Sequence, residues 1–85
     1  MENIQDWRKR LIFRSWHRGT KEMDLIMGSF ADKHIPDFDE EQLVQYDEVL
    51  GENDPDLYNW ISGKEDAPAN KITPVLDLLL AHEFA

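Results

Sequence analysis

Signals that start and stop helices recur at short intervals along the chain, and they constrain its fold more than any other feature. Four segments open with a capping residue, two of them followed by proline: Thr20, Asp39, Asp54-Pro55 and Thr73-Pro74. A glycine or a proline closes the first four apolar segments: Gly19, Pro36, Gly51 and Gly63. No stretch alternates apolar and polar residues as a half-buried strand would. We therefore predict an all-α fold, a compact five-helix bundle that forms a single domain over residues 1–85.

Apolar residues recur at helical spacing within these segments. The first helix is expected over residues 3–18, and eight side chains along the chain are expected in the core: Trp7, Leu11, Met23, Ile26, Phe30, Leu57, Trp60 and Leu79. Phe13 lies opposite the apolar face of the first helix and Trp16 lies to one side of it. Each of these two rings either packs against another helix or is an exposed anchor, and packing is the simpler interpretation.

The charge of the chain is unevenly distributed. The net charge is −9, but residues 1–21 carry +4 and residues 22–85 carry −13. A basic segment on an acidic body orients a molecule in the field of a partner. The acidic body repels phosphate backbones, so a nucleic-acid partner is not expected.

Several kinds of chemistry have no signal in the sequence. Cysteine is absent, which excludes disulfides and thiolate metal sites, and the three histidines fall on separate segments. No phosphate-binding glycine loop or nucleophile motif is present, so we expect no catalytic residues, no cofactor-binding or metal-binding residues, and no enzyme. No apolar run approaches the ~20 residues of a membrane span. The first residues lack the features of a signal or transit peptide, and a cytosolic protein is expected.

The segment from Trp16 to Asp24, here called the elbow, joins the first two predicted helices. We expect Gly19 to end the first helix with positive φ and Thr20 to cap the second. An elbow needs a glycine and a cap, but it does not need the mixed charges of Arg18, Lys21, Glu22 and Asp24. It is therefore the candidate binding surface. In the simpler alternative, Arg18 and Glu22 form only an exposed ion pair, worth less than about 1 kcal/mol.

Two elements of the sequence resemble a known family. Residues 18–25, Arg-Gly-Thr-Lys-Glu-Met-Asp-Leu, are similar to the R-G-x-x-E signature and its continuation in the SdhE family, the FAD assembly factors of succinate dehydrogenase. Residues 53–61, Asn-Asp-Pro-Asp-Leu-Tyr-Asn-Trp-Ile, resemble the second, tryptophan-containing element of that family. The likeness extends over about residues 8–80, including Thr73-Pro74 at the start of the last helix.

The resemblance implies a five-helix, non-enzymatic chaperone. Such a factor binds the flavoprotein subunit of succinate dehydrogenase, and in bacteria that of fumarate reductase, and promotes covalent attachment of FAD to that subunit. By resemblance the partner-binding residues are Arg18, Gly19 and Glu22, bordered by Trp16, His17 and Asp24. The factor itself holds no cofactor, acts as a monomer, and does not insert into a membrane. The absence of a transit segment fits a bacterial, cytoplasmic member. The alternative function is an antitoxin-like or other regulatory protein-binding module.

Overall fold

The computed structural model describes residues 2–83, and within that range it confirms the all-α fold. The helices are α1 (Ile4–Ser15), α2 (Lys21–His34), α3 (Glu40–Leu50), α4 (Asp54–Ile61) and α5 (Pro74–Leu80). Two 3-10 turns join them, η1 (Ile35–Asp37) and η2 (Ala69–Lys71). No strand occurs among the described residues.

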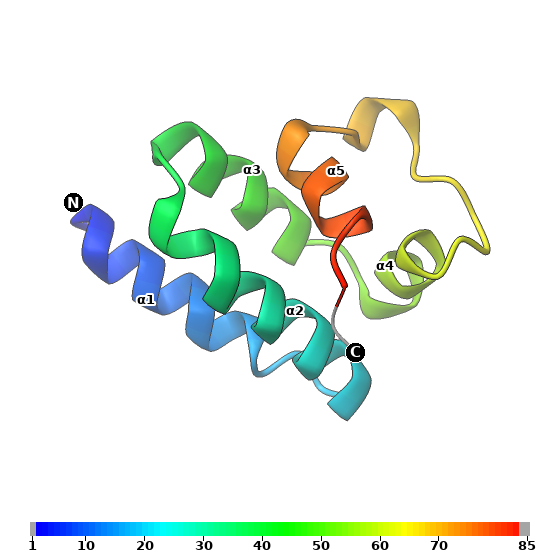
Figure 1. The fold of residues 1–85 in the computed structure, drawn as a ribbon, viewed down its shortest axis with the longest axis horizontal. Helices are drawn as coiled ribbons and strands as arrows, with labels where there is room; N and C mark the ends of the chain where they lie inside the picture. The colour runs from blue at the N-terminus through cyan, green and yellow to red at the C-terminus, as the bar shows by residue number, and fades with distance from the viewer. Residues whose placement is uncertain (1, 84–85) are drawn as a thin grey trace.

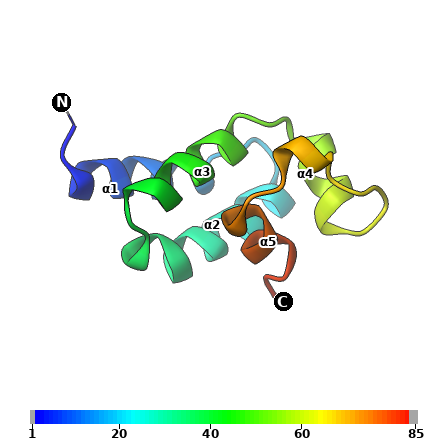
Figure 2. The ribbon, with the colours of Figure 1, turned by 90° about the horizontal axis from the view of Figure 1, so that it is seen from above.

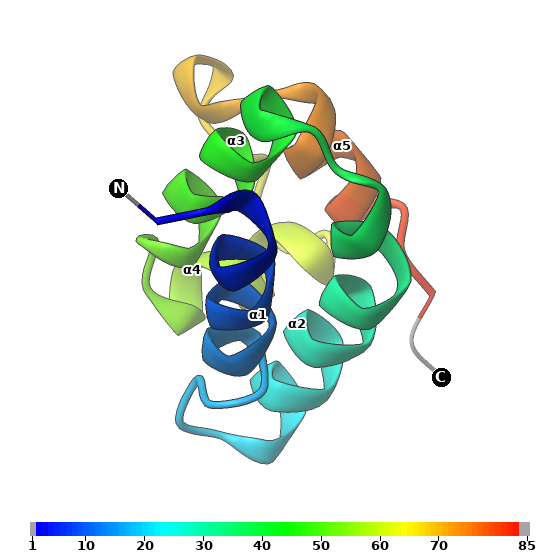
Figure 3. The ribbon, with the colours of Figure 1, turned by 90° about the vertical axis from the view of Figure 1, so that its left-hand side faces the viewer.

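The helices pack as a small bundle around one core. The chain reverses at the elbow, so α1 and α2 lie side by side and antiparallel (Figures 1 and 3). Helix α3 contacts both α1 and α5, and α4 contacts α5 at the end of the molecule away from the N-terminus (Figure 2). The elbow therefore lies at the same end of the molecule as α4 (Figure 1).

Each of the five helices starts with a side-chain cap, because the first backbone N–H groups of a helix have no partner within it. The caps at Thr20, Asp39 and Thr73 are confirmed, and Asp39 forms a full capping box with Gln42. The first cap is Asn3, whose side chain accepts a hydrogen bond from the backbone N–H of Asp6 at 2.9 Å.

Two predicted helix boundaries are wrong. Helix α1 ends at Ser15 rather than Arg18, because Trp16 and His17 close it with short turns to carbonyls three residues back and the chain then leaves the helical path. Helix α4 is capped by Asn53 rather than by Asp54, since the Asn53 side chain accepts from the Asp56 N–H. The second correction leaves the Asp54 carboxylate available for another contact.

The core contains seven of the eight predicted side chains. Six of them are at most 3% exposed, and Trp60 is 9% exposed. Trp7 is the exception, since it is only partly buried and packs against the edge of the core. Beyond those eight, the core also contains Met27, Ile35, Leu43 and Tyr46, all fully buried.

Candidate functional site

The elbow backbone turns sharply at Gly19, which has φ +127°, as predicted. Asp24, at the start of α2, holds the turn: its carboxylate accepts hydrogen bonds from the backbone N–H groups of both Arg18 and Gly19. The Thr20 hydroxyl accepts from the Met23 N–H at 3.2 Å and caps α2. Asp24 therefore shapes the elbow from inside, and its carboxylate is already engaged within the chain.

Trp16 packs flat onto the second helix. A Cβ atom built at Gly28 would lie 2.1 Å from Cδ2 of the Trp16 ring, so only glycine admits the ring at this position. The indole N–H donates to the Asp32 carboxylate at 3.2 Å. Of the two interpretations for Trp16, packing against another helix is the one the structure supports.

The Arg18 side chain points into the molecule and joins the elbow to the connection between α3 and α4. Its guanidinium donates to the Leu50 carbonyl at 2.7 Å and to the Glu52 carbonyl at 2.7 Å. The same group forms an ion pair with Asp54, with Nε at 2.9 Å and an Nη at 2.8 Å from the carboxylate. Arg18 therefore pairs with Asp54 and not with Glu22 as the simpler alternative held.

This ion pair is much less accessible than an ordinary surface pair. The side chains of Arg18 and Asp54 are 11% and 21% exposed, respectively. An arginine that is largely removed from water needs hydrogen-bond partners, and here two carbonyls and one carboxylate engage all three nitrogens of the guanidinium. The signature arginine is therefore engaged within the fold.

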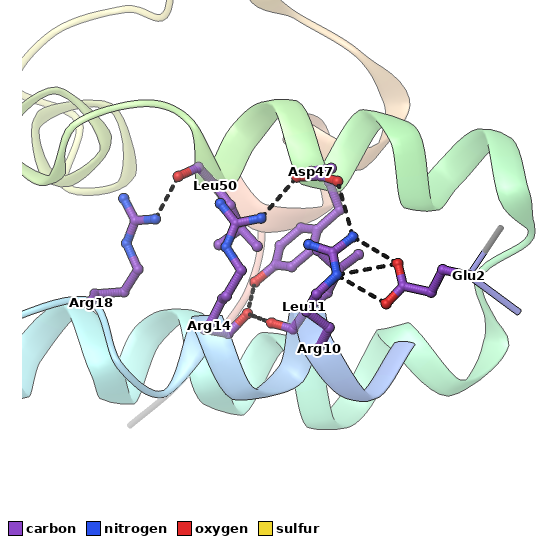
Figure 4. Close-up of polar contacts among 9 residues, drawn as sticks. Glu2, Arg10, Leu11, Arg14, Arg18, Asp47 and Leu50 are labelled. Atoms are coloured by element: carbon purple, nitrogen blue, oxygen red, sulfur yellow. Dashed lines mark hydrogen bonds and ion pairs between the residues drawn. The ribbon is translucent and has the colours of Figure 1, made fainter. Parts of the chain in front are cut away.

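Arg18 is the last of three arginines that reach from α1 and the elbow toward α3 (Figure 4). Arg14 donates to Asp47 at 2.9 Å, and Arg10 pairs with Glu2 at 3.0 Å and with Asp47 at 3.8 Å. The hydrogen bonds that Arg10 donates to the Glu2 carboxylate raise the pKa of Arg10 above its usual value. The basic segment of the sequence is thus partly neutralised by acidic residues of its own chain.

Ser15 of α1 and Tyr46 of α3 form a buried hydroxyl pair. Ser15 is fully buried, donates to the Leu11 carbonyl at 2.7 Å and shares a 2.5 Å hydrogen bond with the Tyr46 hydroxyl. Burial raises the pKa of Tyr46, so this phenol stays neutral. The pair joins the end of α1 to α3 just before the elbow begins.

Three of the predicted site residues remain at the surface. His17, Gly19 and Glu22 are exposed, and a Cβ at Gly19 would meet no atom within 4 Å. The His17 ring stacks on Phe13 with a centroid distance of 4.0 Å, and its Nδ1 lies 2.7 Å from the Phe13 carbonyl. Phe13 is 63% exposed and is thus a surface residue beside the elbow, which the simpler packing interpretation missed.

The six predicted residues therefore divide into two groups. Trp16, Arg18 and Asp24 are half-buried and hold the elbow in its conformation, whereas His17, Gly19 and Glu22 face outward. The sequence did not reveal Asp54 as a member of the first group, because its place before Pro55 is that of a helix cap. No local pattern links residues 36 positions apart, so only the fold brings Arg18 and Asp54 together.

The outward side of the elbow carries His17, Gly19 and Glu22. Among residues 2–83, no three or more metal-binding side chains gather in a way that could hold an ion. Within the same range, no helix combines the length and the apolar character needed to span a membrane.

Comparison with known proteins identifies several relatives. The chain is 40% identical over 82 residues to "Succinate dehydrogenase assembly factor 2, mitochondrial" of Dictyostelium discoideum, and this match covers 96% of the chain and 58% of that protein. The protein of the same name from Cryptococcus neoformans var. neoformans is 42% identical over 82 residues, 95% of the chain and 47% of the relative. That of Drosophila grimshawi is 38% identical over 77 residues, 88% of the chain and 52% of the relative. The chain thus spans about half the length of these curated relatives.

These relatives correct the expected location. A bacterial, cytoplasmic protein was predicted, but the matched proteins are eukaryotic and are named as mitochondrial. The prediction had relied on the absence of a targeting segment, and the start of a sequence is weak evidence when its relatives are about twice as long.

The family comparison agrees with the relatives and with the fold. The family described as "Flavinator of succinate dehydrogenase" matches residues 9–83, which include α1 from Lys9 onward, the elbow, and all later helices. The resemblance inferred from the elbow and from residues 53–61 is therefore confirmed by a match over most of the chain. The chain belongs to the family of flavinators of succinate dehydrogenase.

Proposed function

We propose that this protein is an assembly factor that binds the flavoprotein subunit of succinate dehydrogenase and promotes covalent attachment of FAD to it. The observation that carries the proposal is the family match over residues 9–83. The names of the relatives, succinate dehydrogenase assembly factor 2, support the same partner enzyme.

The elbow is the proposed contact with the flavoprotein subunit. Gly19 has no neighbour within 4 Å of its Cβ position, so a partner backbone can approach closely there. Glu22 and His17 flank it as exposed polar groups. Because Asp24 and Arg18 hold the turn from inside, the outward groups need little ordering on binding, which favours affinity.

In this function the factor does no chemistry of its own. It favours the conformation of its partner in which the flavin and the histidine that accepts it are aligned, and the partner supplies the reacting groups. We propose that the factor acts as a monomer and holds no cofactor. An antitoxin-like role has no support from the three relatives described above, whose names all refer to succinate dehydrogenase assembly.

The direct test is reconstitution of flavin attachment. The apo flavoprotein subunit is incubated with FAD, with or without the protein, and covalent flavin is read as fluorescence of the denatured subunit in a gel. We expect the protein to increase the fluorescent fraction, and a parallel reaction with the fumarate reductase subunit measures the breadth of recognition. Equal fluorescence with and without the protein would overturn the proposal.

Glu22→Ala gives a residue-level test of the same site. Glu22 is exposed, so its removal should cost less than about 1 kcal/mol of stability, chiefly from the helix N-terminus. If Glu22 is desolvated against the subunit, its loss should weaken binding by about 2–5 kcal/mol, roughly 30-fold or more in Kd. Isothermal titration measures the affinity, and Glu65→Ala, at an exposed glutamate in the loop after α4, is the control. Wild-type affinity in Glu22→Ala would exclude Glu22 from the interface.

A further inference from the structure

We propose that Asp54 is a positioning residue for the flavoprotein-binding elbow, and that it acts through Arg18. This inference rests on the proposed function, because the elbow matters only if it contacts the partner. Asp54 is not one of the residues that the family resemblance assigned to binding. Its role follows from the ion pair that joins the start of α4 to the elbow.

The Asp54 carboxylate is not used to cap its own helix, so it is available to bind Arg18. In a helix that begins at Asp-Pro-Asp, the first aspartate is the expected cap, but Asn53 caps α4 instead. The Asp54 carboxylate is turned to Arg18 and accepts from its Nε at 2.9 Å. Asp56, in the same first turn, is exposed and has only a local contact with the Asn53 side chain at 3.0 Å.

The second step is that Asp54 fixes the orientation of the guanidinium. The carbonyls of Leu50 and Glu52 accept from the two terminal nitrogens, and Asp54 accepts from Nε and also pairs with one terminal nitrogen. A planar fork held at all three nitrogens has little rotational freedom. Asp54 is the only one of these three partners that also neutralises the charge of this largely buried cation.

The third step links the side chain to the presented surface. The backbone N–H of Arg18 and that of Gly19 are both bonded to Asp24, so Arg18 is held at its backbone by α2 and at its guanidinium by the α3–α4 connection. Gly19, the next residue, is the exposed turn with φ +127°. Loss of the Arg18 guanidinium contacts should therefore alter the backbone conformation at Gly19, the residue that faces the partner.

The test compares two aspartates of the same helical turn. Asp54→Ala and Asp56→Ala each remove one carboxylate from the first turn of α4, but only the first removes a partner of Arg18. In hydrogen-exchange measurements, we expect the amides of Arg18 and Gly19 to exchange about tenfold faster in Asp54→Ala, the size typical of a contacting pair, and at the wild-type rate in Asp56→Ala. In reconstitution, Asp54→Ala should need about ten times more protein for half-maximal flavin attachment, while saturating protein restores the full yield.

A double-mutant cycle shows whether Asp54 acts through Arg18. In an Arg18→Ala background, Asp54→Ala should produce no further change in the half-maximal concentration. Asp54→Asn, which keeps the shape and an oxygen acceptor, should show a smaller effect than Asp54→Ala and is measured if the alanine variant does not fold. Equal elbow exchange in the Asp54 and Asp56 variants, or additive effects in the cycle, would overturn the inference. If wild-type protein fails to promote attachment, the proposed function fails, and the exchange measurement still decides whether Asp54 positions the elbow.

Discussion

The elbow and the loop after α4 both turn at a glycine with positive φ, yet they are held in very different ways. Gly19 has φ +127° and Gly63 has φ +82°, and a Cβ at either position would meet no atom within 4 Å. Judged by backbone conformation and local space, the two turns are alike.

The difference lies in what holds each turn. The elbow is tied through Arg18 to the α3–α4 connection and Asp54, which are 32 to 36 residues away in the sequence. The turn at Gly63 is flanked by contacts between residues near in sequence, those between Asn59 and Glu65 at 2.8 and 3.2 Å. A glycine turn thus says little by itself about function. A turn held by distant elements presents its groups in one fixed position, which is what a binding surface needs.

The largest expected effect tests this difference directly. Arg18→Ala leaves Asp54 and two carbonyls without their donor, so it should lower the free energy of unfolding by about 2–4 kcal/mol. Lys71, in the connection between α4 and α5, forms a more exposed ion pair with Glu52. Lys71→Ala removes this pair and should lower the free energy of unfolding by about 1 kcal/mol or less. Urea denaturation of both variants gives the comparison. Equal losses would mean that the elbow is not tied more firmly than the loop.

The next effect concerns the packing of the Trp16 ring against Gly28 of α2. Gly28→Ala places a Cβ 2.1 Å from the indole, so Trp16 must move and stability should fall by about 1–3 kcal/mol. In a Trp16→Ala background the clash is gone, and the same substitution should instead stabilise the helix by up to about 1 kcal/mol. Thermal melts of the four proteins check this change of sign. A loss of the same size in both backgrounds would show that Trp16 is not what requires glycine here.

A smaller effect on stability separates the two glycines by function. Gly19→Arg and Gly63→Arg each place a side chain at positive φ, which should cost about 1 kcal/mol or more in either variant. Only Gly19→Arg should fail to support flavin attachment, because a long side chain there blocks the partner. Circular dichroism establishes that both variants remain helical. Normal attachment with Gly19→Arg would argue against the elbow as the contact.

The last prediction concerns the pH dependence of stability, which should affect the elbow and the loop after α4 equally. Burial is the main cause that lowers the pKa values of His34 and His82. The charge of Lys33 lowers the pKa of His34 further, and Asp37 partly opposes this shift. For His82, the neighbouring His34 and Lys33 both lower the pKa further. Because these pKa values are lower in the folded state, the unfolded state binds protons first as pH falls below about 6.5. The protein should therefore lose stability between pH 7 and 5, and His34→Gln/His82→Gln should lose less. Thermal melts between pH 7 and 5 should show the same difference in stability between Arg18→Ala and Lys71→Ala at each pH. The reason is that neither histidine takes part in the ion pairs of Arg18 or Lys71.

The sequence by itself determined the fold class and most helix starts, because both depend on local chemistry. Caps such as Thr20 and Thr73 act on N–H groups three residues away, and positive φ at Gly19 is a property of one residue. The elbow was recognisable for the same reason, since its signature is contiguous in the chain. The mitochondrial naming of the relatives, by contrast, came only from the comparison with known proteins.

Only the tertiary structure decided which residues of the elbow face outward. A charged residue in a turn is expected to be exposed, but the Arg18 side chain has partners on α4 and the α3–α4 connection. Likewise, the Trp16 ring packs against Gly28 of α2. Such contacts join positions that no local period relates, and their geometry exists only once the helices have packed. For that reason the six predicted residues were chosen from the sequence as one site, while the fold divides them into those that hold the elbow and those that it presents.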